Sequence, residues 1–267
     1  MRERGGRPPR APSLAELQVR LAAARSRAGL RRLAAALRGD DRAGARALLR
    51  ACERTLAEQR RLDALFALRE RLRRAGVRLV AGVDEVGVGP LAGPVVAAAV
   101  VLGDDVDLPG LDDSKRLSAA VRERLAREIR RRAVAWAVGE VQPAEIDRLN
   151  VYRAALEAMR RAVLGLAVAP DHLLVDARRI PGVDAPQTAL VDGDACDGSI
   201  AAASIVAKVH RDALMERLDR RFPGYGFAKH KGYATREHLR ALRVLGPSGV
   251  HRRSFAPVLQ LSLAIAP

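Results

Sequence analysis

The chain has 267 residues, 49% of them hydrophobic, and carries a formal net charge of +16. That length suits one domain of about 150–200 residues plus an additional segment, and the hydrophobic share supports a folded core. No apolar run reaches the ~18–20 residues of a membrane span, so we expect no membrane contact.

The net charge and the cysteines indicate the class of binding partner and the cellular compartment that we expect. A strongly basic chain is drawn to polyanions, of which a phosphate backbone is the commonest. The two cysteines, Cys52 and Cys196, lack metal-type spacing, and the N-terminus has no apolar signal region. These features predict reduced cysteines and a cytoplasmic protein.

The N-terminal part is Arg-rich. Residues 1–13 are expected to form a disordered basic tail, and residues 14–76 a helical extension that begins after Ser13 and ends at Gly76. Residues 1–76 contain 20 Arg against 8 Asp and Glu, so they hold +12 of the net charge. The extension is either a helical hairpin with an ordinarily solvated surface or an accessory nucleic-acid arm, and we favour the second.

From residue 77 to about residue 260 the pattern alternates between strands and helices. The predicted strands are 77–89, 93–102, 133–141, 172–176 and 188–194. The predicted helices are 118–132, 143–166 and 199–222. Ser118 is expected to cap the first of them, and Ser199 to begin and cap the third. This order predicts an α/β domain with a central mixed five-stranded sheet flanked by helices.

Four acids occupy comparable places in this pattern. Asp84 and Glu85 lie on the first strand, and Asp176 and Asp194 end the fourth and fifth. Acids at the ends of central strands converge at one edge of a sheet, where they repel one another. Oxygen ligands suit Mg²⁺ or Mn²⁺, and two such ions can hydrolyse a phosphodiester. A single strand-end carboxylate is usually just exposed, but the adjacent pair favours a metal site.

Glycines follow the acidic pair at once. Gly87 and Gly89 would let a phosphodiester approach the backbone N–H groups. The alternative is a tight turn that needs positive φ, which explains one glycine more easily than several. Asp192 and Asp197 add charge near Asp194 but are interpreted as bystanders.

Six segments together resemble bacterial ribonuclease HII in order and spacing, over about residues 78–258. They are "GVDEVGVGPLAGPVVAAAVVL", "LDDSKRLS", "LLVDARRIPGV", "GDACDGSIAAASIVAKVHRD", "FPGYGFAKHKGYATREH" and "HRRSFAPV". The resemblance implies a ribonuclease H-like fold and metal-dependent endonucleolytic cleavage of RNA in RNA–DNA hybrids. It also implies incision 5′ of single ribonucleotides embedded in duplex DNA, leaving 3′-hydroxyl and 5′-phosphate ends.

The resemblance also implies roles for individual residues. The metal-binding catalytic carboxylates would be Asp84, Glu85, Asp176 and Asp194. The backbone of Gly87 and Gly89 would sense the 2′-hydroxyl, and Tyr233 would pack on the sugar at the RNA-to-DNA junction. The contacts to the duplex backbone would be Ser114, Lys115, Lys208 and Arg211. For Tyr233 a plain core position is the alternative.

Two positions depart from the family's pattern. The family has Arg where this chain has Val88, and Lys where this chain has Asp192. A guanidinium can grip a phosphate with two hydrogen bonds and Val cannot, so we expect weaker phosphate binding. Surplus charge in the N-terminal extension is a candidate compensation.

Three readings of the activity follow from this pattern. The favoured one is an active junction-type ribonuclease H; the second is a weakened relative that binds hybrids without cutting them. The third is a ribonuclease HIII-type enzyme, against which the "HKGY" tyrosine counts. We expect a monomer. A sliding-clamp motif is not evident in residues 258–267, and a degenerate version stays open.

Overall fold

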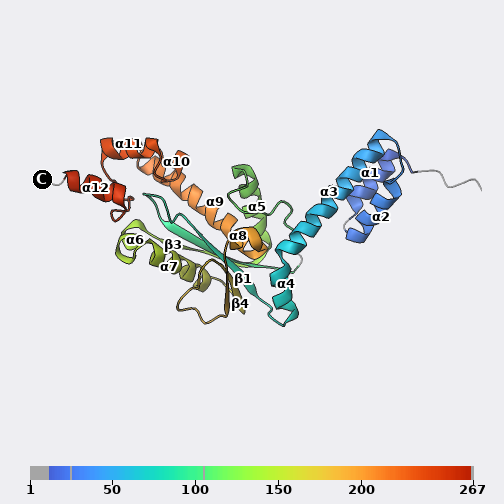
Figure 1. The fold of residues 1–267 in the computed structure, drawn as a ribbon, viewed down its shortest axis with the longest axis horizontal. Coiled ribbons are helices and arrows are strands. Elements are labelled where there is room, and N and C mark those ends of the chain that lie inside the picture. The colour runs from blue at the N-terminus through green and yellow to red at the C-terminus, as the bar shows by residue number, and fades with distance from the viewer. Residues whose placement is uncertain (1–11, 25, 105, 266–267) are drawn as a thin grey trace, which may run out of the picture. The chain divides into compact units, whose positions relative to one another are not determined.

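The computed structural model describes residues 12–24, 26–104 and 106–265 (Figure 1). The chain divides into two compact units, Met1–Ala64 and Leu65–Pro267. The predicted disordered tail falls outside the described residues, apart from Pro12 and Ser13.

The first unit is helical, as the sequence predicted. Its helices are α1 (Leu14–Ala23), α2 (Arg27–Leu37) and α3 (Ala43–Leu65). Ser13 caps α1: its hydroxyl accepts from the Glu16 N–H, and the Glu16 carboxylate accepts from the Ser13 N–H at 2.7 Å. The three helices bury one small core, formed by Leu17, Leu30, Leu33, Ala34, Leu37, Ala45, Cys52 and Leu56. The N-terminal extension therefore has a hydrophobic core of its own.

The second unit is built on a mixed five-stranded sheet, which confirms the predicted architecture. The strands are β1 (Val80–Val86), β2 (Val95–Leu102), β3 (Ala133–Val141), β4 (His172–Asp176) and β5 (Gln187–Leu190), in the order β3-β2-β1-β4-β5. β1 pairs antiparallel with β2 and parallel with β4, and β4 pairs parallel with β5. The two central parallel strands thus end at the same edge of the sheet.

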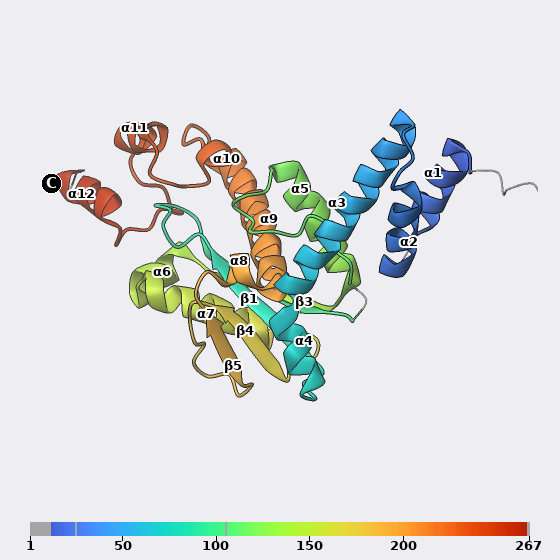
Figure 2. The same cartoon turned by 45° about the vertical axis from the view of Figure 1, so that its right-hand side comes forward.

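Helices cover both faces of this sheet. The helices of this unit are α4 (Ala67–Arg74), α5 (Ala119–Arg132), α6 (Pro143–Leu149), α7 (Val151–Leu164), α8 (Gly193–Cys196), α9 (Gly198–Arg221), α10 (Phe227–His230), α11 (Arg236–Leu245) and α12 (Ala256–Ile265). Figure 2 shows α7 and α9 on opposite sides of the sheet. Successive side chains of a strand alternate between faces, so Ala81 and Val83 join the core under α7 while Val80 packs with Ile200 of α9. No helix in the described part of the chain is long and apolar enough to cross a membrane.

The boundary between the two units lies earlier than the sequence indicated. Helix α4 belongs with the sheet, because the buried Arg69 guanidinium donates to the carbonyls of Leu102 and Gly103 at 2.9 and 2.8 Å. Gly198 also leaves room for the Phe66 ring, because a β carbon at residue 198 would stand 2.4 Å from the nearest atoms of that ring. Residue 76, the predicted boundary, follows the end of α4 instead.

Two predicted helices differ in detail. The single helix expected over 143–166 is broken at Asn150, whose φ is 67°; among residues with a side chain, Asn adopts positive φ most readily. Its side chain accepts from the Arg153 N–H and so caps α7. The last long helix is capped by Asp197 and not by Ser199, because the Asp197 carboxylate accepts from the N–H of Ser199 at 2.8 Å.

The fifth strand is shorter than predicted. It ends at Leu190, and Asp192 follows with a φ of 52° in the left-handed region. That residue turns the chain into the short helix α8, so Asp194 lies on a helix and not at a strand end. The predicted strand over 188–194 is wrong in its second half.

Candidate active site

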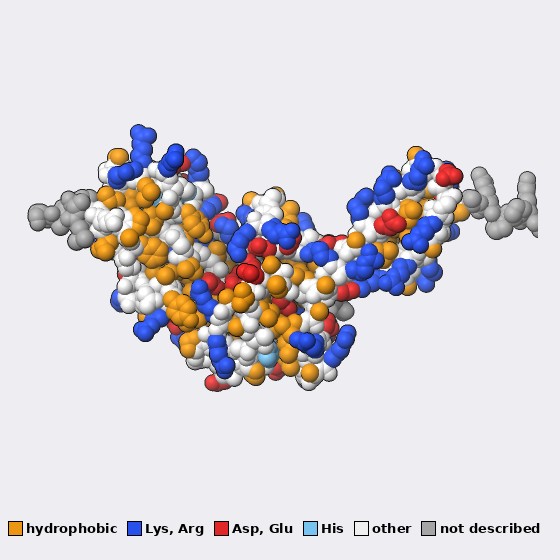
Figure 3. All heavy atoms as spheres, in the orientation of Figure 1, with side chains coloured by type: hydrophobic (Ala, Val, Ile, Leu, Met, Phe, Trp, Pro, Cys, Tyr) orange, Lys and Arg blue, Asp and Glu red, His pale blue; other side chains and the backbone are white. Residues whose placement is uncertain are grey.

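Three of the four predicted acids meet at one edge of the sheet. Asp84 and Glu85 end β1, Asp176 ends β4, and the register pairs Val83 with Val175 just before them. One carboxylate oxygen from each acid lies within 4.8 Å of the others. In Figure 3, acidic side chains gather on the visible face of this unit near α8. The parallel pairing of β1 with β4 is what brings these acids together.

These carboxylates are held largely away from water. Asp84 is 5% exposed, and burial together with the charge of Glu85 raises its pKa well above the ordinary value. Burial also raises the pKa of Glu85 and of Asp176. The Glu85 Oε2 atom is buried and has no hydrogen-bond partner among the described residues. Crowded carboxylates with an unused oxygen fit a divalent cation such as Mg²⁺ or Mn²⁺.

The fourth predicted acid stands beside this group. The Asp194 Oδ2 accepts from the Lys115 Nζ at 2.9 Å, and the charge of Asp194 raises the pKa of both Asp84 and Asp176. The Gly193 N–H, from the same short helix, donates to the Asp176 Oδ1 at 2.7 Å. Helix α8 therefore ties Asp176 in place and brings Asp194 within electrostatic reach.

Arg178 was missed by the sequence reasoning. Its Nη1 lies 3.1 Å from the Glu85 Oε1, and its guanidinium covers the Tyr152 ring at 5.3 Å. This charge partly offsets the effect of burial on the pKa of Glu85. Its place two residues after Asp176 was the available signal, but nothing in the sequence points its side chain toward Glu85.

The glycine segment, residues 87–94, and Tyr233 lie side by side. Gly89 is exposed, and a β carbon there would stand 3.8 Å from the Tyr233 Cε1. Tyr233 is 43% exposed, which excludes the alternative of a core position. Gly87 and Gly93 have φ values of 87° and 82°, so the tight-turn requirement holds for both. An open backbone and an aromatic ring thus form one continuous surface.

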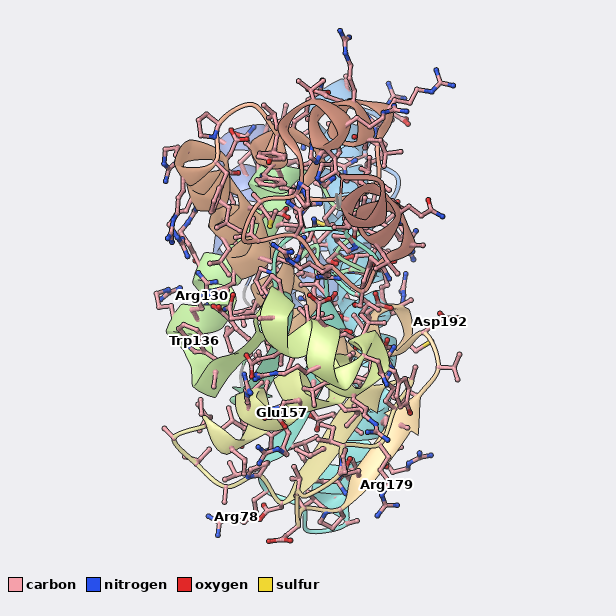
Figure 4. All side chains as sticks on the ribbon, turned by 90° about the vertical axis from the view of Figure 1, so that its left-hand side faces the viewer. Arg78, Arg130, Trp136, Glu157, Arg179 and Asp192 are labelled. Carbon is pink, nitrogen blue, oxygen red and sulfur yellow. The ribbon has the colours of Figure 1, made fainter. Side chains whose placement is uncertain are left out.

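Val88 lies between these glycines with its side chain half-buried. It packs against the core cluster shared by β1, β2 and α7. Asp192 is exposed on the loop after β5 and points away from the body of the unit in Figure 4. Asp192, the second departure from the family's pattern, therefore adds negative charge within electrostatic reach of Asp176, whose pKa it helps to raise.

The four predicted duplex contacts fall into two groups. Lys115 is exposed, and Lys208 is partly exposed and paired with Asp212 at 2.7 Å. Ser114 is buried and shares a hydrogen bond with Ser204 at 3.0 Å, and Arg211 is fully buried. For Ser114 and Arg211 the prediction of a surface contact does not hold, because their polar atoms are engaged inside the protein.

Comparisons with known proteins agree with this geometry. Residues 81–258 match the family described as ribonuclease HII. A ribonuclease HII of Myxococcus xanthus is 55% identical over 228 residues, 84% of this chain and 78% of the relative. One from an Anaeromyxobacter strain is 51% identical over 259 residues, 96% of this chain and 82% of the relative.

A solved structure agrees as well. The complex of PCNA with ribonuclease HII from Archaeoglobus fulgidus contains a chain that is 31% identical, with a TM-score of 0.56 and coverage of 66% of this chain and 94% of that one. The mixed sheet and the acidic edge define a nuclease with a ribonuclease H-like fold. The chain belongs to the ribonuclease HII family, and this membership supports ribonuclease H activity on RNA–DNA hybrids.

Proposed function

We propose that the chain hydrolyses the RNA strand of RNA–DNA hybrids and incises duplex DNA on the 5′ side of a single embedded ribonucleotide. The reaction is a metal-dependent phosphodiester hydrolysis that leaves 3′-hydroxyl and 5′-phosphate ends. The observation that carries this proposal is the meeting of three carboxylates, one buried and two partly buried, within 4.8 Å of one another in a member of the ribonuclease HII family.

The carboxylates provide the metal ligands in this proposal. Asp84, Glu85 and Asp176 would hold Mg²⁺ or Mn²⁺ in a two-metal site, and Asp194 is the fourth proposed ligand. Such ions activate a water molecule and stabilise the leaving oxygen. Lys115 offsets the charge of Asp194, because its ammonium donates directly to that carboxylate.

The glycine segment and the tyrosine select the substrate. The exposed Gly89 offers backbone where a side chain would keep a ribose away. Tyr233, next to it, presents a flat ring on which a deoxyribose packs, so that a DNA nucleotide 3′ of the ribonucleotide is favoured. Lys115 and Lys208 remain the proposed contacts to the duplex phosphates.

The direct test is cleavage of a labelled DNA duplex with one ribonucleotide, in Mg²⁺ or Mn²⁺. We expect incision 5′ of the ribonucleotide. Val88→Arg should lower KM roughly 10-fold with little change in kcat, because a charge-assisted hydrogen bond to phosphate contributes about 1.5–3 kcal/mol. Some stability should be lost, since Val88 packs against the core.

Val88→Met is the matched control, because it adds length without charge and should leave KM unchanged. An equal gain from Met would show that the charge is not responsible. The competing function is a relative that binds hybrids without cutting them, for which Val88 and Asp192 are the grounds. Tight binding without incision at any metal concentration would favour it, and cleavage restored by Val88→Arg would locate the defect in the glycine segment.

The N-terminal helical unit is proposed to add contacts to phosphates. Arg46, Arg50 and Arg54 lie four residues apart along α3, so they share one side of the helix, and all three are exposed. None of the three forms an ion pair within the described part of the chain. Figure 3 shows Lys and Arg side chains across the visible surface of this unit.

Replacing these three arginines by Ser should weaken binding to any duplex and reduce its salt dependence. Each lost phosphate contact lowers the slope of log K against log salt by about 0.9, so we expect a reduction of about 1–3. Anisotropy between 50 and 200 mM KCl, without divalent metal, measures this slope. The Lys triple variant keeps the charge and should keep the slope. An unchanged slope in the Ser variant would mean an ordinarily solvated surface.

This activity would serve ribonucleotide removal and RNA primer removal during DNA replication and repair, in the cytoplasm. The chain is proposed to act as a monomer. The Archaeoglobus fulgidus structure shows that protein with PCNA, and for this chain a sliding-clamp contact is proposed only through a degenerate motif in residues 258–267.

A further inference from the structure

Arg252 lies fully buried beneath the glycine segment. Its Nη2 donates to the Gly87 carbonyl at 2.6 Å, its Nη1 to the Val88 carbonyl at 2.8 Å, and its Nε to the Gly93 carbonyl at 3.0 Å. One guanidinium thus binds the start of the loop, at Gly87 and Val88, and a second point six residues after Gly87, at Gly93. The planar fork of Arg makes this possible, because its donors are fixed relative to one another.

Arg211 is the second fully buried guanidinium, and it joins two segments. Its Nε donates to the Pro94 carbonyl at 3.0 Å and its Nη2 to the Ala92 carbonyl at 3.2 Å. Its Nη1 donates to the Lys231 carbonyl at 3.0 Å, on the segment that carries Tyr233. A β carbon on Gly87 would stand 2.1 Å from the Arg211 Nε, so that glycine is required for the guanidinium to fit.

Direct backbone bonds complete the connection between the two segments. The Leu91 N–H donates to the Gly232 carbonyl at 2.8 Å, and Gly232 lies so close to Ala92 that a β carbon would come within 2.5 Å of its carbonyl oxygen. On the other side, His238 is fully buried and its Nδ1 donates to the Tyr233 carbonyl, 2.9 Å away. The backbone of the tyrosine turn, residues 230–233, is therefore bonded both to the glycine segment and to the buried His238.

The two guanidinium groups carry charge that no acid in the described structure neutralises, since neither forms an ion pair there. Burial and the neighbouring Arg211 lower the pKa of Arg252 to about 9. A buried cation is costly unless its donors are satisfied, and here six carbonyls satisfy them. What remains is positive charge directly under a loop in which Val88, half-buried, offers none.

We propose that Arg211 and Arg252 are positioning residues that hold two segments together as one rigid surface for the ribonucleotide and its phosphate. The segments are the glycine segment, residues 87–94, and the Tyr233 turn, residues 230–233. The two guanidinium groups also supply positive charge from beneath this surface. The proposal rests on the proposed function of the same site. It explains how a chain with Val at position 88 keeps a defined, electropositive loop.

The test compares Arg252→Lys and Arg211→Lys, which keep the charge but lose the fork, with Arg69→Lys. Arg69 is a buried Arg that also donates to two carbonyls, away from this loop. Fluorescence anisotropy without divalent metal gives the ratio of affinities for a duplex with one ribonucleotide and for the all-DNA duplex. We expect this ratio to fall at least about 5-fold in the first two variants and to stay unchanged in Arg69→Lys.

The outcomes separate the two claims. If the parent protein neither incises the ribonucleotide duplex nor prefers it in binding, the proposed function fails. If the parent discriminates and folded Arg252→Lys and Arg211→Lys discriminate equally well, the positioning role is overturned.

A measurement on the unaltered chain covers the case in which these variants do not fold. In native-state hydrogen exchange, the amides of Leu91 and Tyr233 should share one opening equilibrium, agreeing within about 3-fold. Clearly different protection of the two amides would show that the segments move independently and would overturn the proposal.

Discussion

Asp84→Asn is expected to abolish hydrolysis, with a loss of at least about 10³-fold in kcat/KM, or about 4 kcal/mol of transition-state stabilisation. Asp84 is the most buried of the three grouped carboxylates, and the charges of both Glu85 and Asp176 act on it. An amide has no charge to offer a divalent cation and donates on one side where a carboxylate only accepts. Incision of a ribonucleotide-containing duplex measures the loss.

The same substitution should raise the melting temperature of the metal-free protein. The pKa of Asp84 lies well above its ordinary value because burial and Glu85 disfavour the ionised form, so the folded state works against this charge near neutral pH. Stability and activity should therefore move in opposite directions, as they do where a strained site is kept for function.

Asp184→Asn is the control for this prediction. It removes a negative charge from an exposed side chain on the segment between β4 and β5, and should change neither the melting temperature nor the cleavage rate appreciably. A residual rate in Asp84→Asn within 10-fold of the parent would contradict the metal-ligand role. A lower metal-free melting temperature would contradict the electrostatic argument.

Much of the fold followed from sequence because its signals are local. Alternation of apolar strands with amphipathic stretches predicted the mixed sheet, and Ser13 and Ser118 were found as helix caps. The errors lie where one residue changes the backbone direction. Asn150 and Asp192 adopt positive φ, and each divided an element that periodicity alone had drawn as continuous.

The site was predictable only in part, for a related reason. The sequence placed Asp84 and Glu85 on the first strand and Asp176 at the end of the fourth, and the sheet brings them together. The buried guanidinium groups give no such signal. Arg252 is separated by 165 residues from the Gly87 carbonyl it binds, and a basic residue in a sequence is expected at the surface. Long side chains that cross the fold escape any local pattern.

The buried polar groups near the site form two contrasting arrangements. Carboxylates gather at the ends of β1 and β4 without enough partners, whereas the guanidinium groups beneath the glycine segment have their donors satisfied by carbonyls. The first arrangement leaves a site ready for a cation, and the second leaves a fixed surface beside it. A phosphodiester needs both at once, because the reacting phosphate must be held still while its charge is compensated.

Gly82→Ala is expected to be the most destabilising single-methyl change in the catalytic unit. A β carbon at Gly82 would lie 2.0 Å from the carbonyl carbon and oxygen of Ser199 and 2.6 Å from the Ile200 nitrogen. These are backbone atoms in the first turn of α9, so no flexible side chain can yield. Overpacking of this kind typically costs 1–3 kcal/mol and here should reach about 3 kcal/mol or more. The melting temperature should fall by roughly 10 °C, measured by circular dichroism.

Gly249→Ala is the matched control, because it adds the same methyl group where no atom lies within 4 Å and no positive φ is required. It should leave the melting temperature within about 2 °C of the parent, since surface changes usually stay within ±0.5 kcal/mol. Gly82 lies two residues before Asp84, so displacing α9 from β1 should also separate the acids on the strand from Ser204 and Asp194, which reach the site from α9 and α8. A stable Gly82→Ala protein with full activity would show that α9 can move off the strand freely, and the close packing that positions these groups would then be dispensable.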